Sequence, residues 1–389
     1  MKTKYQLAFL GSPNSLIPTI LKALYVHVTE LGISEEMIAV IDTGNFGSDY
    51  RPNAPVFCLY FGEPGFNFKD LALLDQLIND AGLILPVVPD LTRFKASIPP
   101  QIQKINGLQL NSAEGIEALV SCILEGFGLL RTARKLFISY KRDESSIEAM
   151  QLFEEFERHG FDVFLDTHSV RPSEPFQEEL WHRMADAEIV VLLDTPGFLN
   201  SHWTKEELAR ANSMQIGILQ IIWPSHTLAN IATLSIPFQL TVNDFGNAKF
   251  TQAERYLNDA TISRLVDQVE YLRARSLAAR QDNIVAEFVS AAKKQNVPIV
   301  LFPENIIVAR KGDDKEFLII PTVGVPQALN YHKSEEIGAK MAAKPETIYL
   351  LYDHINIRDR WLEHLHWLDK FLPIKGIKVI DSEKWLQGI

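Results

Sequence analysis

Hydrophobic and polar positions alternate along the first part of the chain with two different periods. Short apolar runs with the character of buried strands are YQLAFLG, PVFCLYFG and LILPVVPD, and amphipathic stretches with helical spacing separate them. Buried strands joined by amphipathic helices are typical of a parallel sheet with crossover helices. Residues 1–130 are therefore predicted to form an N-terminal α/β domain, which closes with a helix over about 112–130.

The same alternation begins again in the middle of the chain. The strand RKLFISYKRDE precedes a helix over about 146–159, for which Ser145 and Glu148 provide an S-x-x-E capping box. The apolar runs FDVFLD, EIVVLLD and IGILQIIW follow, with helical segments between them. We assign residues 131–225 to a second α/β domain.

The last third of the chain has a different pattern. Residues 226–259 carry scattered Pro, Gly, Asn and Thr, so we interpret them as a connecting region without a predicted structure. A long polar helix over about 260–295, with room for one break, leads into the final domain. Adjacent strands within 298–321 predict a hairpin, and further strands and a helix follow. Residues 260–389 are thus predicted to be a helix plus a mixed α/β domain.

Composition narrows the classes of function. A formal net charge of −11 disfavours nucleic acid as the main partner, because phosphate binding needs an excess of Lys and Arg. The two cysteines, Cys58 and Cys122, lie in apolar stretches and are expected to be buried thiols in a reducing cytoplasm. The apolar core of the N-terminus is too short for a signal peptide, and no run approaches the ~18 apolar residues of a membrane span. We expect a cytoplasmic protein without a membrane partner.

Three motifs in the middle segment occur in the order and spacing of one family. They are FISYKRDE at 137–144, FDVFLDTHSVRP at 161–172 and EIVVLLDTPGFLNSHWTKEEL at 188–208, which contains a W-x-x-x-E-L box. Over about ninety residues the segment resembles the TIR (Toll/interleukin-1 receptor) domain. The resemblance implies a flavodoxin-like parallel sheet with helices on both faces.

The resemblance also implies a catalytic residue. In NAD-cleaving members of the family the glutamate four residues after the tryptophan of the box is catalytic, which places this role on Glu207. The local geometry agrees, since positions i and i+4 of a helix share a face and Trp203 and Glu207 can point into one pocket. Glu206 would point roughly 100° away. Without the box, Glu207 would be interpreted as a solvated carboxylate and Trp203 as a core anchor.

Further candidate residues lie where strands end. Open α/β sheets bind ligands at the carboxyl ends of their strands, which makes Ser139, Tyr140, Lys141, Arg142 and Asp166 candidates for substrate contact; an ordinary strand-to-helix loop is the alternative.

The loop after the second strand carries Arg171 and Pro172, which resemble the family's usual pair. In the family this loop often forms contacts between TIR domains. Ser173 and Glu174 stand where glycine is common in the family, and they permit fewer backbone conformations than glycine does.

The chemistry implied by the family fits a carboxylate in a water-poor cleft. Breaking the bond between nicotinamide and ribose develops positive charge on the ribose carbon, which a carboxylate stabilises more strongly than it stabilises the substrate. Nicotinamide is already a good leaving group, so no metal or other cofactor is expected, and NAD is the substrate. Water as the acceptor gives ADP-ribose and an internal nucleophile gives a cyclic product; the sequence does not choose between them.

The outer domains offer weaker signals. Gly11-Ser12 and the turn from Gly44 to Gly47 could cradle a phosphate with backbone amides, but short glycine turns are usually structural. A metal site is not expected near the C-terminus, because His364 and His366 are two apart on a predicted helix and project in different directions. Asp353 and His354 complete that candidate group, and the nearby stripe of Trp361, Leu365 and Leu368 suits packing or a partner surface.

The whole layout is similar to bacterial TIR proteins with an α/β domain before the TIR domain and an extra domain after it. The leading hypothesis is an NAD hydrolase or cyclase of prokaryotic antiphage immunity that self-associates through TIR contacts. The main alternative is a non-enzymatic TIR scaffold that recruits other TIR domains. A third reading is an enzyme that acts on a base-modified nucleotide.

Overall fold

The computed structural model describes residues 3–12, 14–52, 54–165, 176–198, 216–227, 235–246, 256–302, 306–311, 315–341 and 344–388, with the backbone alone at 176, 177 and 311. The chain forms two compact units. The first comprises Met1–Thr132 and Asp259–Ala274, and the second comprises Ala133–Asn258 and Arg275–Ile389.

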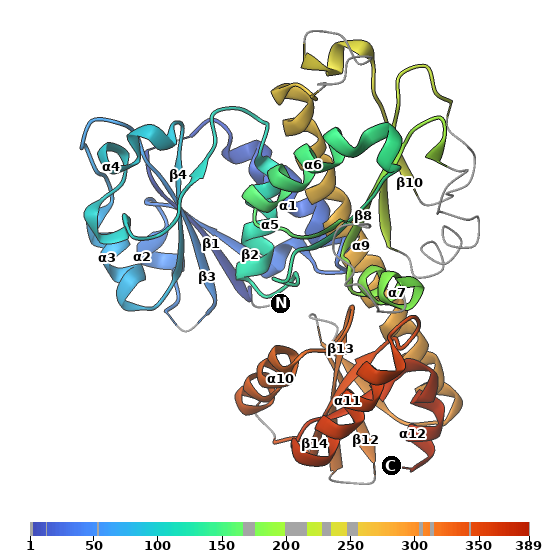
Figure 1. Ribbon diagram of the computed structural model, residues 1–389. Helices are drawn as coiled ribbons and strands as arrows, with labels where there is room; N and C mark the ends of the chain where they lie inside the picture. Colours follow the sequence, from blue (N-terminus) through green and yellow to red (C-terminus); the bar gives the residue numbers. More distant parts are fainter. Residues whose placement is uncertain are drawn as a thin grey trace. The chain divides into compact units, whose positions relative to one another are not determined.

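The first unit contains the parallel sheet that the alternating pattern predicts (Figure 1). The strand order is β2-β1-β3-β4-β5, that of flavodoxin-like folds. The strands are β1 (Tyr5–Gly11), β2 (Ile38–Ile41), β3 (Val56–Phe61), β4 (Leu83–Val88) and β5 (Leu108–Gln109). The helices are α1 (Ile17–Glu30), α2 (Phe46–Asp49), α3 (Leu71–Asn79), α4 (Phe94–Ser97) and α5 (Ile116–Gly126).

Alternate residues of these strands pack in two layers. Ala8 and Leu10 of β1 and Cys58 and Tyr60 of β3 belong to one core cluster, which also includes Leu74 of α3. The period-2 pattern of buried side chains on a sheet covered on both faces explains why these strands read as continuous apolar runs. Both cysteines are free, as predicted; Cys58 is buried, which raises the pKa of its thiol, whereas Cys122 is half-buried and not fully buried as expected.

The long helix α9 (Asp259–Lys294) is continuous over 36 residues and contributes its first part to this unit. Arg273 is fully buried there; its Nη1 lies 2.7 Å from Glu125 Oε1 and 3.7 Å from Glu270 Oε2, and its Nη2 donates to the carbonyl of Arg131. A buried guanidinium is tolerated only when charged and polar groups surround it in this way.

The second unit contains two more sheets. The central one has the order β10-β9-β8-β6-β7, is parallel throughout and confirms the predicted flavodoxin-like arrangement. Its elements are β6 (Lys135–Ser139), α6 (Arg142–Arg158), β7 (Asp162–Leu165), α7 (Phe176–Asp186), β8 (Ile189–Asp194), β9 (Gly217–Ile222) and β10 (Ser235–Gln239). β10 lies in the stretch for which the sequence pattern predicted no structure.

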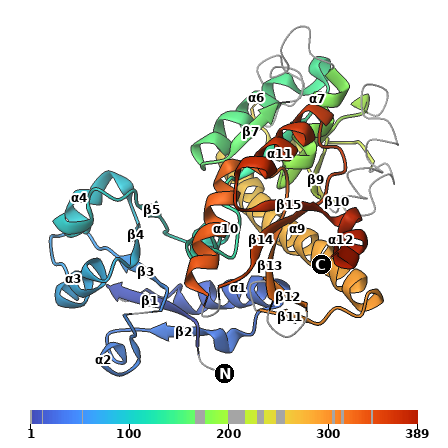
Figure 2. The same cartoon turned by 90° about the horizontal axis from the view of Figure 1, so that it is seen from below.

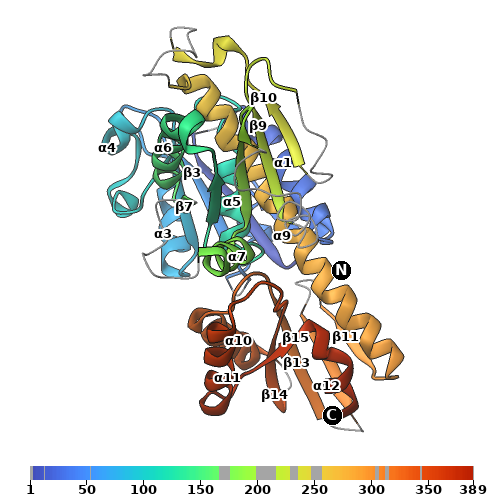
Figure 3. The ribbon, with the colours of Figure 1, turned by 45° about the vertical axis from the view of Figure 1, so that its right-hand side comes forward.

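The C-terminal sheet mixes both directions of pairing, as predicted from the adjacent strands. β11 (Ile299–Leu301), β12 (Ile307–Lys311) and β13 (Lys315–Thr322) pair antiparallel, and β14 (Thr347–Tyr352) and β15 (Lys375–Lys378) continue in parallel. Helices α10 (Ala328–Lys340) and α11 (Asp359–Phe371) cover one face, and α12 (Ser382–Gly388) lies on the other (Figure 3).

Helix α7 links the central and C-terminal sheets of this unit. Near its start, Glu179 pairs with Arg358, and the rings of His182 and Trp361 lie 5.6 Å apart, so α7 runs beside the start of α11 (Figure 2). At its end, Asp186 pairs with Lys135 and accepts a hydrogen bond from Val325 N at 3.0 Å. Both ends of α7 are therefore held by segments far away in the sequence.

No helix among the described residues is long and apolar enough to cross a membrane.

The buried cluster around Arg273 predicts a large loss of stability when the guanidinium is removed. Arg273→Met removes the buried cation that contacts the carboxylates of Glu125 and Glu270, which costs about 3–5 kcal/mol. Denaturant unfolding of the full chain measures the loss. The control is Arg264→Met on the same helix, because Arg264 is exposed. Equal unfolding free energies for the two variants would contradict a structural role for the buried cluster.

Asp267 of α9 predicts a dependence of stability on pH. Burial, together with the nearby Glu117, Glu114 and Glu270, raises its pKa to about 6, although the amide of Gly115 donates to it at 3.0 Å. A raised pKa in the folded state means that this group costs stability above pH 6, and that the cost disappears as the pH falls toward about 4.

Asp267→Asn keeps the hydrogen-bond acceptor and removes the charge. We expect the variant to melt about 2–4 °C higher than wild type at pH 7.5, with a difference that shrinks when melting is repeated near pH 4. Asp259→Asn, at an exposed position of the same helix, is the control for net charge. A difference that is equal at both pH values would contradict this assignment.

Candidate functional site

The carboxyl edge of the central sheet gathers polar groups at its topological switch point. β6 pairs with β7 on one side and β8 on the other, so the connections leave β6 and β8 in opposite directions. The crevice beside such a point is where open α/β sheets bind ligands. Here β6 ends at Ser139 and β8 ends at Asp194.

The four residues predicted from the first motif occupy different environments. Ser139 is fully buried, and its Oγ has no hydrogen-bond partner among the described residues. Tyr140 is also buried, Lys141 is half-buried and Arg142 is exposed. Ser139 is therefore the member of this set whose buried polar atom is left without a partner among the described residues.

Sequence reasoning missed Glu144, which joins the two strand ends. Its carboxylate pairs with Lys141, and Oε2 accepts a hydrogen bond from Gly197 N at 2.9 Å. Burial opposes ionisation of Glu144, but hydrogen bonds from Lys141, Thr195 and Gly197 outweigh burial and lower its pKa. We call the set of Lys141, Glu144 and Gly197 the switch-point bridge.

Local backbone geometry places Glu144 in this bridge. Ser145 has non-helical angles (φ −146°, ψ 24°), which separate a turn over 142–144 from the rest of α6. The capping box predicts a helix start at this position, and the angles agree, but the Ser145 hydroxyl donates to the carbonyl of Lys141 at 3.3 Å. The kink turns Glu144 toward the segment that follows β8.

Glu144 and Lys141 approach Gly197 so closely that a side chain at this position would displace them. A Cβ at this position would collide with Glu144 Oε1 and Lys141 Nζ, both of which are the far ends of flexible side chains. Another residue here would therefore move the side chains and break the bond to the amide. The sequence T-P-G after β8 indicates a turn, but it does not indicate this contact.

A second polar cluster ties Asp194 to the neighbouring strands. Its fully buried carboxylate accepts from Gln220 Nε2 at 2.8 Å and lies 3.1 Å from His226 Nε2. Gln220 Oε1 in turn accepts from Ser235 Oγ of β10 at 2.9 Å. The end of β8 is thus held from β9 and β10 as well as from α6.

Five of the predicted site residues lie outside the described part of the chain. Asp166, Arg171 and Pro172 fall within 166–175, and Trp203 and Glu207 fall within 199–215. The structure does describe where the second stretch begins: Phe198 is fully buried in the core of the central sheet, and its amide donates to the carbonyl of Thr195 at 3.0 Å.

The candidate metal ligands near the C-terminus make other contacts. His364 packs its ring against Trp361 and Trp367. Asp353 and His354 approach each other only to 3.9 Å. Among the residues that the structure describes, there is no group of three or more His, Cys, Asp or Glu side chains that could hold a metal ion.

Comparison with known proteins identifies the central domain. Residues 136–245 match the family model of the TIR domain, which spans the central sheet through β10. The chain therefore contains a TIR domain. No curated protein matches the chain.

Similar solved structures give no further guidance. Proximal thread matrix protein 1 from the mussel byssus is 11% identical, with 70% of this chain and 97% of that chain covered and a TM-score of 0.22. Tagatose-6-phosphate ketose/aldose isomerase from Escherichia coli is also 11% identical, with 72% and 81% covered and a TM-score of 0.19. Scores this low support no conclusion on fold or function.

The switch-point bridge predicts that Gly197→Ala raises the pKa of Glu144. The added methyl displaces the carboxylate from the Gly197 amide and removes one of the hydrogen bonds that favour the ionised form. An NMR pH titration of the glutamate side-chain carboxyl carbons measures this shift, and Glu144→Gln identifies the resonance. Gly47→Ala, whose Cβ would meet nothing within 4 Å, is the control. An unchanged titration of Glu144 in Gly197→Ala would contradict the bridge.

Proposed function

We propose that this protein cleaves NAD between nicotinamide and ribose, with Glu207 as the catalytic carboxylate. The observation that carries the proposal is the W-x-x-x-E-L box at 203–208, which follows the third apolar run of a matched TIR domain. Glu207 lies four residues after Trp203, the spacing that brings two side chains to one face of a helix. The indole would form an apolar wall beside the carboxylate.

The proposed reaction needs little beyond that carboxylate. Nicotinamide leaves with the electrons of the glycosidic bond and becomes neutral, while the ribose carbon develops positive charge. A carboxylate in a site with little water stabilises this charge in the transition state. Capture by water gives ADP-ribose and one proton, and capture by an internal nucleophile gives a cyclic ADP-ribose. NAD is the substrate, and the chain's residues supply this chemistry without a resident cofactor.

The described part of the domain supports the proposal because it fixes the chain at Gly197 and Phe198, just before the segment that carries Glu207. The switch-point bridge holds Gly197, and buried Phe198 is the last described residue before the segment that carries Trp203 and Glu207. Ser139 places an unbonded hydroxyl at the same edge. Pre-set groups of this kind lower a barrier because they need no reorganisation during the reaction.

The proposal extends to the biological setting that the family resemblance implies. Depletion of NAD, or its conversion to a nucleotide signal, would serve antiphage defence in a prokaryotic cytoplasm. Self-association of TIR domains through the loop with Arg171 and Pro172 would then set when the enzyme is active. We accordingly expect activity to rise with protein concentration.

Removal of the carboxylate tests the catalytic assignment. Glu207→Gln keeps the size of the side chain and removes its charge, so nicotinamide release from NAD should fall by about 10²-fold or more. Glu206→Gln is the matched control, because on a helix the neighbouring position would point roughly 100° away from position 207. Release is followed by chromatography at several protein concentrations.

Two results would overturn the proposal in different ways. Cleavage by Glu207→Gln at the wild-type rate would remove Glu207 from the mechanism. An absence of cleavage by wild-type protein, even when concentrated or crowded, would favour the non-enzymatic scaffold. Sedimentation of the same samples then reports whether the TIR domains assemble.

A further inference from the structure

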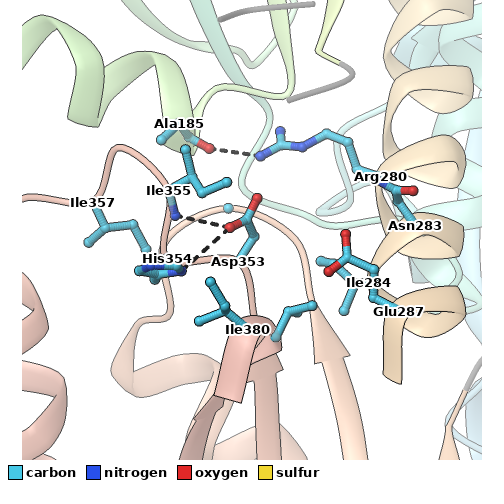
Figure 4. Close-up of a pocket in the computed structure, with 12 residues that line it drawn as sticks. Ala185, Arg280, Asn283, Ile284, Glu287, Asp353, His354, Ile355, Ile357 and Ile380 are labelled. Atoms are coloured by element: carbon cyan, nitrogen blue, oxygen red, sulfur yellow. Dashed lines mark hydrogen bonds and ion pairs between the residues drawn. The ribbon is translucent and has the colours of Figure 1, made fainter. Parts of the chain in front are cut away.

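A cavity of about 140 Å³ lies at the carboxyl edge of the C-terminal sheet (Figure 4). The segments that follow the ends of β13, β14 and β15 form one wall of this cavity, through Gly324, Asp353 and Val379 among others. The second part of α9 forms the opposite wall, and Ala185 at the end of α7 contributes to the rim. Because these three strands are parallel, their carboxyl ends meet at one edge, the usual ligand position in α/β sheets.

Two carboxylates approach the cavity from opposite walls. Asp353 comes from the end of β14, and Glu287 comes from α9 (Figure 4). Among the described residues, Glu287 forms no hydrogen bond or ion pair, and the same holds for its neighbour in the wall, Asn283. Asp353 uses Oδ1 to accept from Ile355 N at 2.9 Å. Carboxylate and amide acceptors thus face the cavity with little of their capacity used.

The one arginine of the lining is directed elsewhere. Arg280 is buried, and its Nη1 and Nη2 donate to the carbonyls of Ala187 and Ala185, each at 2.8 Å. These bonds hold the end of α7. They also occupy the guanidinium, so we do not expect Arg280 to bind an anion in the cavity. The polar groups that remain available to an occupant are mainly acceptors.

Apart from His354, whose Nδ1 lies 3.9 Å from Asp353 Oδ1, the rest of the lining is apolar and limits the size of an occupant. Four isoleucines, Ile284, Ile355, Ile357 and Ile380, line the cavity. A cavity of roughly 150 Å³ lined by such side chains holds a molecule the size of benzene. The cavity opens to solvent beside the exposed Ile355 and Ile380, and its volume fits an apolar body of about six non-hydrogen atoms.

We propose that this cavity binds a small organic cation, an ammonium group on a compact apolar body. The ammonium would donate to Asp353, Glu287 and Asn283, and the apolar body would pack against the isoleucines. An ammonium group has three donors and no acceptor, which matches a lining of carboxylate and amide oxygens.

An occupant of this cavity would also contact both domains of the unit. Ala185 belongs to α7, and Arg280 already ties α7 to α9 at this point. The occupant would therefore stabilise the packing of the TIR domain on the C-terminal sheet, since a ligand stabilises the arrangement that binds it.

A set of probes with one shape and three charges tests the proposal. The probes are 3-methylbutylammonium, 3-methylbutan-1-ol and 3-methylbutanoate, with ribose as a ligand rich in hydroxyls. Binding to the full chain is measured by calorimetry and by saturation-transfer NMR. We expect the ammonium to bind about tenfold tighter than the alcohol or more, because a charge-assisted hydrogen bond adds that much, and the carboxylate to bind weakest.

Two double variants locate the binding. Asp353→Asn with Glu287→Gln keeps the shape of the cavity and should remove the advantage of the ammonium over the alcohol. Glu335→Gln with Glu336→Gln removes the same charge from exposed positions of α10 and should leave the advantage intact. Heat-unfolding curves of each variant confirm that it is folded.

Every other result overturns the proposal. Tightest binding of 3-methylbutanoate would make the cavity an anion site, and tightest binding of ribose would make it a site for hydroxyls. Equal binding of the ammonium in both double variants would place it elsewhere on the protein. No binding by any probe would leave the cavity without this role. None of these outcomes depends on cleavage of NAD.

Discussion

The carboxylate of Glu144 holds together the two loops that meet at the switch point of the central sheet. It pairs with Lys141 after β6 and accepts from the amide of Gly197 after β8, 53 residues further along the chain. A half-buried carboxylate in this position must be hydrogen-bonded to stay ionised, and the lowered pKa of Glu144 reflects those bonds. The bridge fixes the point from which the segment with Glu207 departs, so the proposed chemistry depends on it.

Much of the fold could be predicted from the sequence, because strands that are buried on both faces of a sheet have continuous apolar sequences. The runs that begin at Tyr5 and Ile189 are such strands, and the hairpin within 298–321 also follows from local pattern. β10 escaped prediction because Pro237 interrupts it and its side chains are half-buried. A proline in a short run argues against a strand, and only the position of β10 at the edge of the sheet makes it possible.

The candidate site was less accessible to sequence reasoning. Glu207 follows from the resemblance to the TIR family and Ser139 from its place at the end of a strand, but neither inference reveals a contact between residues far apart. No local pattern distinguishes Glu144 from a surface glutamate near a helix start, or Gly197 from a turn glycine. Their significance comes from one hydrogen bond between two loops. The cavity beside Asp353 was missed for the same reason, because its walls come from separate elements.

The proposed mechanism requires a carboxylate at position 207 that faces the sugar of bound NAD. A structure of the assembled protein with a non-cleavable NAD analogue tests this most directly. We predict that the ribose beside nicotinamide lies at the carboxyl edge between β6 and β8, with a carboxylate oxygen of Glu207 within about 3 Å of its hydroxyls or its anomeric carbon. A bound analogue with Glu207 turned toward bulk solvent, remote from the ribose, would contradict the account.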